Sequence, residues 1–162
     1  MHHTEESNYK RIANFLESAT KTPATLDELE NIECELKTRF PESYRKFQLE
    51  FGDFCHEKIE VFTVSSSDTC SDNIVDVRKH ISQYGSDAFH QAFNGALPDI
   101  PETYIPFSYY ENDYYCFDMN HYDGSECPVV YFTETLNKHD EPIRIADTFI
   151  DWFVLEINKT EE

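Results

Sequence analysis

Tyr104–Phe132 reads YIPFSYYENDYYCFDMNHYDGSECPVVYF, and this stretch decides the fold. Its apolar and aromatic residues alternate with other residues in three runs, which are separated by turn sequences at 111–113 and 123–124. Successive side chains of a strand point to opposite faces, so a period of two predicts strands. We expect strands at 104–110, 115–119 and 128–133, paired antiparallel because the turns between them are short. The alternation places Tyr109 and Tyr115 in the core, and Tyr110 and Tyr114 on the other face.

The segments on either side of this meander have helical spacing. Apolar residues over 12–19 predict a first helix, which Pro23 breaks. Thr25-Leu-Asp-Glu28 is a capping box, so a second helix should begin there and end near Phe40. Pro41 suits the first turn of a third helix that Gly52 stops. Residues 146–157 predict a closing helix with a wide apolar face, capped by Asp147 or Thr148.

Between these two parts the pattern is mixed. Lys58–Val64 is rich in β-branched and aromatic residues and predicts a strand, and a polar loop follows at 65–72. Helical spacing returns from Ile74 to about Tyr84, with a further turn or two over 86–94. We therefore predict a single α+β domain over residues 1–162, with its core at about 8–158. An antiparallel meander should pack against the N-terminal helices and the closing helix.

Composition limits the function. The chain has 162 residues, 15% of them aromatic, and a formal charge of −19. That aromatic content indicates a folded domain, because a disordered acidic tail lacks the apolar area that offsets chain entropy. The charge argues against nucleic acid and against an anionic membrane as direct partners. No stretch is apolar enough to span a membrane, and the N-terminus lacks a signal peptide, so we expect a cytoplasmic protein.

The sequence offers little for catalysis, metal or cofactor. Five cysteines form an odd set without framework spacing, so reduced thiols are the simplest interpretation. No His-x-x-x-His or Cys-x-x-Cys pair and no glycine-rich phosphate loop is present. We expect no metal, no cofactor and no enzyme. A hydrolase with an unrecognised acidic site stays as the alternative, because sequence does not show which side chains meet in space.

The order of landmarks resembles the SUKH superfamily, the Smi/Knr-type domain. Phe40-Pro-Glu-Ser-Tyr44 is similar to its "LP-x-x-Y/F" element, and Phe47–Gly52 to its "F-L-x-x-x-N-G" ending, with Phe51 where Asn is usual. Residues 105–118 resemble its "I-P-F … G-D-x-x-x-x-D" hairpin, with Asn112 where Gly is common. Residues 128–132 are similar to its next strand, and 149–153 to its closing helix. The landmarks extend over most of residues 25–157.

The resemblance implies a domain without a catalytic centre. Bacterial members of the superfamily are implied to bind and neutralise a toxin domain, frequently a nuclease. The expected function is thus that of an immunity protein with a basic toxin as its partner. The alternative is a regulatory scaffold or adaptor of the same fold, because some eukaryotic relatives resemble regulatory scaffolds. The oligomeric state is left open.

The charge is unevenly placed along the chain. Between His80 and Asn137 there is no Lys or Arg, yet nine acidic residues are present. An acidic and aromatic surface would complement the positive cleft that a nuclease needs for phosphate. The predicted partner-binding residues are those at the two turns: Tyr110, Glu111, Asp113, Tyr114, Tyr122, Asp123 and Glu126. The alternatives are a solvated face for solubility, and cross-strand stacking for the tyrosines.

Two residues are given structural roles. Asp118 falls in a strand, where Asp is disfavoured, so it should have a specific partner such as a backbone amide in the 121–124 loop. An interface role for Asp118 is the alternative. Trp152 lies in the 149–153 segment that resembles the family's closing helix, and a structural role is expected for it.

Overall fold

A four-stranded antiparallel sheet forms the centre of the protein, which we describe from a computed structural model covering residues 5–67, 69–81, 100–110, 113–132 and 141–161. Its strand order is β3-β4-β5-β6. The bounds are Tyr104–Tyr110 for β3, Asp113–Asp118 for β4, Val129–Phe132 for β5 and Ile143–Ala146 for β6. The first three strands and the α+β class confirm the predictions, whereas β6 was not predicted.

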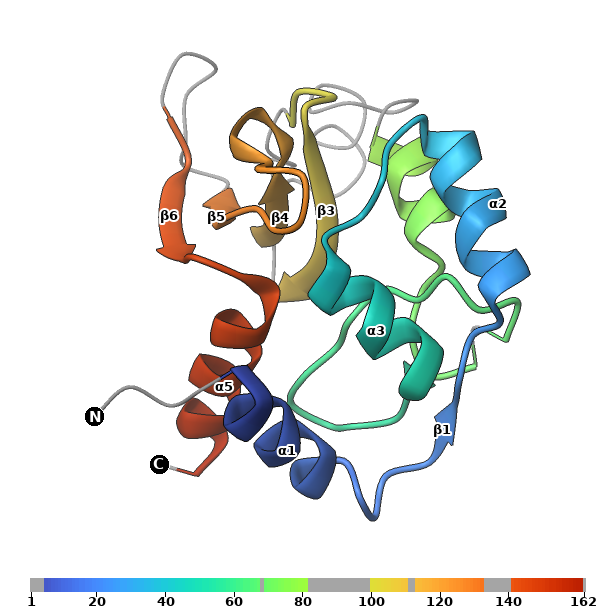
Figure 1. The fold of residues 1–162 in the computed structure, drawn as a ribbon, viewed down its shortest axis with the longest axis vertical. Coiled ribbons are helices and arrows are strands. Elements are labelled where there is room, and N and C mark those ends of the chain that lie inside the picture. The colour runs from blue at the N-terminus through green and yellow to red at the C-terminus, as the bar shows by residue number, and fades with distance from the viewer. Residues whose placement is uncertain (1–4, 68, 82–99, 111–112, 133–140, 162) are drawn as a thin grey trace, which may run out of the picture.

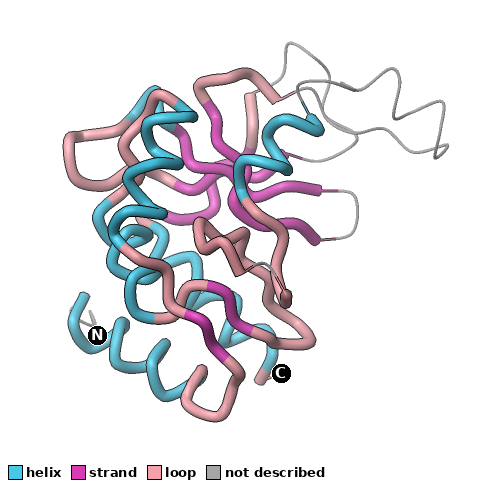
Figure 2. The backbone as a smooth tube through the Cα atoms, turned by 90° about the vertical axis from the view of Figure 1, so that its right-hand side faces the viewer, coloured by secondary structure: helices cyan, strands magenta, loops and turns pink. Residues whose placement is uncertain are grey.

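Helices lie below this sheet and to its right in the view of Figure 1. The bounds are Glu5–Phe15 for α1, Leu26–Leu36 for α2, Glu42–Glu50 for α3 and Phe149–Thr160 for α5. Residues 74–81 form a further helix. α1 packs along α5, and Figure 2 shows the small pair of β1 (Lys21–Thr22) and β2 (Asp53–Phe54) apart from the main sheet. The predicted capping box at Thr25 and Glu28 is present, and Thr148 caps α5.

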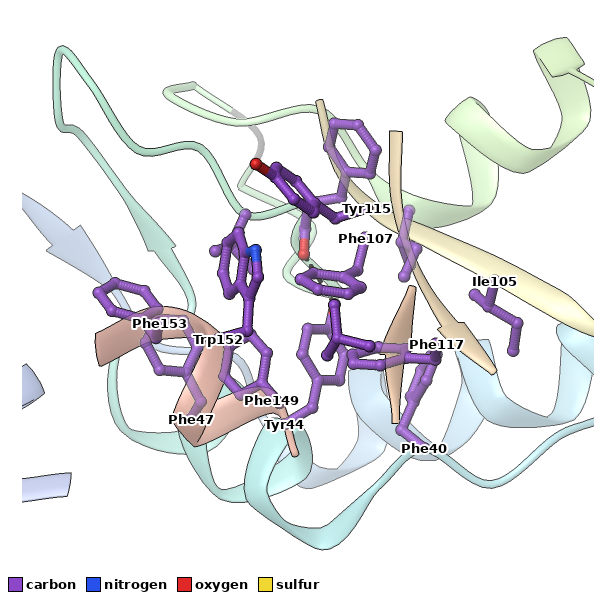
Figure 3. Close-up of a cluster of buried hydrophobic side chains, with 14 of the residues drawn as sticks. Phe40, Tyr44, Phe47, Ile105, Phe107, Tyr115, Phe117, Phe149, Trp152 and Phe153 are labelled. Atoms are coloured by element: carbon purple, nitrogen blue, oxygen red, sulfur yellow. Dashed lines mark hydrogen bonds between the residues drawn. The ribbon is translucent and has the colours of Figure 1, made fainter. Parts of the chain in front are cut away.

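The core on one face of the sheet is built from aromatic rings that β3, β4, α3 and α5 supply (Figure 3). Phe107 of β3 stacks on Phe117 of β4, with ring centroids 4.2 Å apart. Phe149 of α5 lies edge-on to Tyr44 and Phe47 of α3, at 5.5 and 5.2 Å. Edge-to-face and offset arrangements are favoured by the ring quadrupoles. The geometry of the ring pairs therefore stabilises this core in addition to the burial of apolar area.

A β-bulge in β3 changes the face of the sheet on which Tyr109 lies. The register of β3 against β4 shifts between Pro106 and Ser108. The extra residue reverses the alternation after it. Tyr109 therefore lies opposite Tyr114 instead of on the face of Tyr115, and it is 37% exposed rather than in the core. Tyr114 lies on the other face from Tyr115, as predicted, but Phe62 packs against it there and it is only 7% exposed. Tyr115 is buried as predicted.

The predicted strand at Lys58–Val64 is wrong: the segment runs beside β3 without forming a ladder. One backbone bond, from Phe62 N to Phe107 O at 2.7 Å, joins the two. Buried side chains replace the missing ladder, since Tyr44 Oη donates to Phe62 O and Gln48 Oε1 accepts from Val64 N. Its apolar content reflects burial, not strand pairing.

The predicted end of α2 was also too late. Lys37 takes a left-handed conformation with φ 56° and ends the helix. The turn that follows is fixed by Glu33, whose Oε2 accepts from Phe40 N at 2.7 Å and pairs with Arg45 at 3.1 Å. The predicted helix over 86–94, the last residues of the helix from Ile74, and the 111–112 turn lie outside the described residues.

The expectation of five reduced cysteines is wrong for one pair, because Cys55 and Cys70 form a disulfide with their Cα atoms 5.0 Å apart. Cys34, Cys116 and Cys127 are free. Asp53 brings the pair together, since its carboxylate accepts from Cys70 N at 3.1 Å and Ser71 N at 2.8 Å. Asp53 is 17 positions from Cys70 and 18 from Ser71 in the sequence. The spacing of the cysteines alone therefore could not predict this disulfide.

The capping box predicts a pH-dependent stability. Hydrogen bonds from Ser66 and Thr25 lower the pKa of Glu28 from 4.5 to about 2. Because the pKa is lower in the folded state, the stabilisation is complete above pH 4.5 and is lost as the pH falls towards 2. Glu28→Gln should thus be less stable than wild type at pH 7, with the difference shrinking over that range. Urea unfolding at several pH values measures this, with exposed Glu30→Gln of the same helix as control; a constant difference would contradict it.

Candidate functional site

The seven predicted partner-binding residues are not brought into one cluster. Tyr110, Glu111, Asp113 and Tyr114 belong to the β3–β4 hairpin, whereas Tyr122, Asp123 and Glu126 belong to the β4–β5 loop. These two connections lie at opposite ends of β4. A strand of six residues is about 17–20 Å long. The candidate residues therefore form two separate sites at the two ends of the sheet.

The β4–β5 loop, residues 119–128, is organised by its own carboxylates. Asp118 Oδ1 accepts from Asn120 N at 3.0 Å, and Asp118 Oδ2 lies 2.7 Å from His121 Nδ1. Asp123 Oδ1 accepts from Ser125 N and Glu126 N, both at 2.8 Å. These backbone bonds hold the pKa of Asp123 below its usual value. Asp118 thus has the kind of backbone partner that its position in a strand predicted, at Asn120 rather than within 121–124.

Glu126 fastens the same loop to α3. Its Oε2 accepts from Ser43 N at 2.9 Å and its Oε1 from Ser43 Oγ at 2.6 Å. Glu42 N donates to Ser125 O at 2.8 Å beside them. The first amides of a helix lack intrahelical partners, and an anion is favoured there, so Glu126 caps α3 in place of a local side chain. Its half-buried position raises its pKa, and the bonds from Ser43 oppose this.

Tyr122 lies half-buried in the loop. Its hydroxyl is buried and has no hydrogen-bond partner among the described residues. Burial raises the pKa of this phenol. The part of Tyr122 that faces outward is therefore limited, whereas Asp123 is exposed.

At the hairpin, Asp113 and Tyr114 are engaged within the sheet. Tyr131 Oη of β5 donates to Asp113 Oδ2 across the sheet. The Tyr114 ring packs against Tyr109 at 5.1 Å and Phe62 at 6.5 Å, and burial raises its pKa. Glu111 and the side chain of Tyr110 lie outside the described part of the chain.

Trp152 lies in the core beneath this end of the sheet. Its ring contacts Phe107 at 4.8 Å and Tyr115 at 5.3 Å, and it is almost fully buried. The indole Nε1 has no hydrogen-bond partner among the described residues. The ring contacts are those expected of a residue with a structural role.

A pocket that the sequence did not predict lies beside the hairpin end of the sheet. It has a volume of about 590 Å³. It is lined by Phe54, His56, Glu57, Lys58, Ile59, Glu60, Cys70, Ser71, Tyr109, Tyr115, Glu156, Lys159 and Thr160. These come from segments 54–60, 70–71, β3, β4 and the end of α5, so no local motif in the sequence could reveal the pocket.

Within the described residues, no group of three or more His, Cys, Asp and Glu side chains is placed to hold a metal ion. As a separate finding, no helix in the described parts of the chain is both long and apolar enough to cross a membrane.

Comparisons with known proteins place the fold. A solved protein from Pseudomonas syringae pv. tomato has a similar structure, with a TM-score of 0.57 and 19% sequence identity. The match covers 88% of this chain and 93% of that one. No curated protein matches the sequence significantly. The sequence profile of the SMI1 / KNR4 family (SUKH-1) matches residues 23–154, which is most of the chain. The protein therefore belongs to the SMI1 / KNR4 family (SUKH-1).

Proposed function

We propose that the protein is an immunity protein that binds a basic toxin domain, a nuclease being the favoured chemistry, and blocks its active site in the cytoplasm. It would do so as a binding module without catalysis of its own. Membership of the SMI1 / KNR4 family supports this function, because the bacterial part of the superfamily is implied to neutralise toxins.

The observation that carries the proposal is a set of acidic side chains that form no direct ion pair with a basic residue in the described part of the chain. Among the described residues, Glu102, Asp123 and Glu126 form no ion pair with Lys or Arg. By contrast, some acids of the helices have basic partners, as in the pairs Arg39–Glu42 at 2.9 Å and Lys79–Glu35 at 2.8 Å. Like charges kept together cost stability. A positive partner surface would remove that cost and would be attracted to this side of the molecule.

Asp123 is exposed and presents its second carboxylate oxygen to solvent as a proposed contact. Asp113 is a half-buried candidate at the hairpin, and Tyr110 and Glu111 stay in the proposal as the sequence predicted them. Tyr114 and Glu126 would contribute indirectly. Tyr114 packs within the sheet and Glu126 holds the β4–β5 loop, so both would position the contact residues. Tyr122 would add apolar area at the loop end.

The function is tested with the toxin candidate encoded next to this gene. The C-terminal domain of that neighbouring protein is expressed with and without this chain, and growth, complex formation and nuclease activity are measured. Rescue of growth with loss of nuclease activity in the complex is the expected result. A stable complex without toxicity would instead favour the regulatory scaffold, and absence of both would contradict the proposal.

Removal of charge at both ends of β4 should slow association with that toxin. Asp113→Asn combined with Asp123→Asn keeps an acceptor for Tyr131 and for the loop amides but removes two charges. We expect an association rate lower by about tenfold at low salt, with a shallower salt dependence, because exposed charges act mainly through steering.

Stopped-flow kinetics at two salt concentrations measure this effect. Glu17→Gln combined with Glu30→Gln is the matched control, since it removes two exposed charges elsewhere. An unchanged rate and salt slope in the folded Asp113/Asp123 variant would place the interface on another surface.

A further inference from the structure

The pocket beside the hairpin has one wall from the segment after β2 and another from the end of α5. Its third side comes from β3 and β4 through Tyr109 and Tyr115. Cys70 and Ser71 line the pocket where the disulfide to Cys55 and the Asp53 carboxylate hold their loop. The part of the wall at Cys70 and Ser71 is thus held by covalent and hydrogen-bonded contacts.

Glu60 is a half-buried carboxylate in this pocket that receives little hydrogen bonding from the described residues. The one hydrogen bond to its carboxylate from the described residues comes from Asp72 N, at a long 3.4 Å. Burial is the main cause that raises the pKa of Glu60. The negative charges of Asp72 and Asp53 raise it further. No Lys or Arg within the described parts of the chain forms an ion pair with it.

The other charged groups of the pocket have different environments. Glu156 is paired with Lys159 at 3.0 Å. Glu57 and Lys58 are exposed, so water screens their charges. A half-buried carboxylate is screened less than exposed groups are, and Glu60 is therefore the group in this pocket that gains most from a cation.

The aromatic walls suit a cation as well. Tyr109 is 37% exposed at the pocket. The Lys159 ammonium lies 6.0 Å from the centroid of the Tyr115 ring and is paired with Glu156, so the ring considered for a further cation is that of Tyr109. A planar guanidinium stacks on a tyrosine face and pairs with a carboxylate through two N–H groups, which an ammonium does not do.

We propose that this pocket receives an arginine side chain of the partner protein, whose guanidinium pairs with Glu60 while its stem lies against Tyr109. This inference rests on the proposed function and names a specific anchor for it. A nuclease toxin presents arginines at its phosphate-binding cleft, and insertion of one of them would remove it from catalysis. The anchor lies at the hairpin end of the sheet, which also carries Asp113, and not at the end that carries Asp123.

The pocket chemistry is tested without the toxin. N-acetyl-arginine amide is titrated into isotope-labelled full-length protein and followed by NMR, with N-acetyl-citrulline amide as the neutral probe of the same shape. We expect weak, saturable binding of the arginine probe that shifts the signals of Tyr109 and Ile59, and no saturable binding of citrulline. Glu60→Gln should weaken the arginine probe at least about tenfold, because one member of a partly buried charge pair is lost.

Glu60→Gln should fold as well as wild type. Its amide oxygen still accepts from Asp72 N, and the repulsion from Asp53 and Asp72 disappears. Thermal unfolding checks this, and Glu30→Gln is the charge-matched control that should bind the probe like wild type. Equal binding of both probes, or an unchanged affinity in Glu60→Gln, would overturn the proposal.

The same variants separate this inference from the function. If the neighbouring toxin binds wild type and Glu60→Gln equally, the arginine anchor fails and the immunity function stands. If the arginine probe binds at Glu60 but no toxin is neutralised, the cation pocket stands and the immunity function fails. With both correct, Glu60→Gln should weaken the toxin complex at least about tenfold, mainly through faster dissociation.

Discussion

Phe153→Ala is expected to lower the free energy of unfolding by about 3–5 kcal/mol, the usual cost of emptying a close-packed aromatic site. Phe153 is fully buried in α5. Its ring contacts Phe47 at 5.3 Å, Trp152 at 5.8 Å and Phe54 at 6.1 Å. The site is therefore enclosed by α3, by β2 and by its own helix. Rings held on three sides cannot close over the space that the substitution leaves, so the cost should fall in the upper part of that range.

Chemical denaturation of both proteins measures this difference. Leu155→Ala in the same helix is the matched control, because Leu155 is 41% exposed. Its effect should stay within about 0.5 kcal/mol, as for other surface positions. An unchanged midpoint for Phe153→Ala would show that the closing helix does not occupy the position described.

The sequence allowed prediction of those parts of the fold that local patterns determine. The capping box at Thr25 satisfies neighbouring amides, and the α5 stripe follows the helical period, so both could be predicted from a few adjacent residues. The three strands of the meander were predicted for the same reason. β6 was not predicted, because its alternation of Ile143 and Ile145 with Arg144 covers only four residues and lies directly before the closing helix.

Tertiary contacts determined the rest. The bulge at Phe107 depends on pairing with β4, and it reversed the predicted face of Tyr109, whereas Tyr114 is buried because Phe62 packs against it. Residues 58–64 look like a strand by composition, but the buried side chains of Tyr44 and Gln48 take the hydrogen bonds that a neighbouring strand would supply.

The candidate site, like the fold, has features that the sequence could predict and features that depend on tertiary contacts. The acidic character of residues 80–137 follows from composition alone. Sequence could not show that Glu126 caps α3, because its partner Ser43 is 83 positions away. Glu60 was overlooked for a related reason: its pocket is assembled from separate segments, and its lack of a cationic partner is a property of the folded chain.

The turn after α3 links the core to that pocket. Gly52 has φ +57°, in the left-handed region that glycine adopts readily. A Cβ there would lie 2.2 Å from Thr22 O, 2.7 Å from Ala24 N and 2.8 Å from Pro23 Cα, all of them backbone atoms. The close approach lets β2 pair with β1 directly after the helix. From β2 the chain continues through Asp53 and Phe54 to the disulfide, so the turn also positions one wall of the pocket.

Gly52→Ala should therefore destabilise the protein by about 2–5 kcal/mol, from the left-handed backbone and from overpacking together. Gly124→Ala is the matched control: its φ is +97°, but nothing lies within 4 Å of the added Cβ, so it has a backbone cost without a clash. Urea unfolding should show the larger loss for Gly52→Ala, and binding of N-acetyl-arginine amide should weaken in that variant alone. Equal losses in the two variants would mean that β1 and β2 do not approach as closely as described. In that case the wall of the pocket that carries Glu60 would have to be held mainly by the contacts of Tyr44 and Gln48 with residues 62–64.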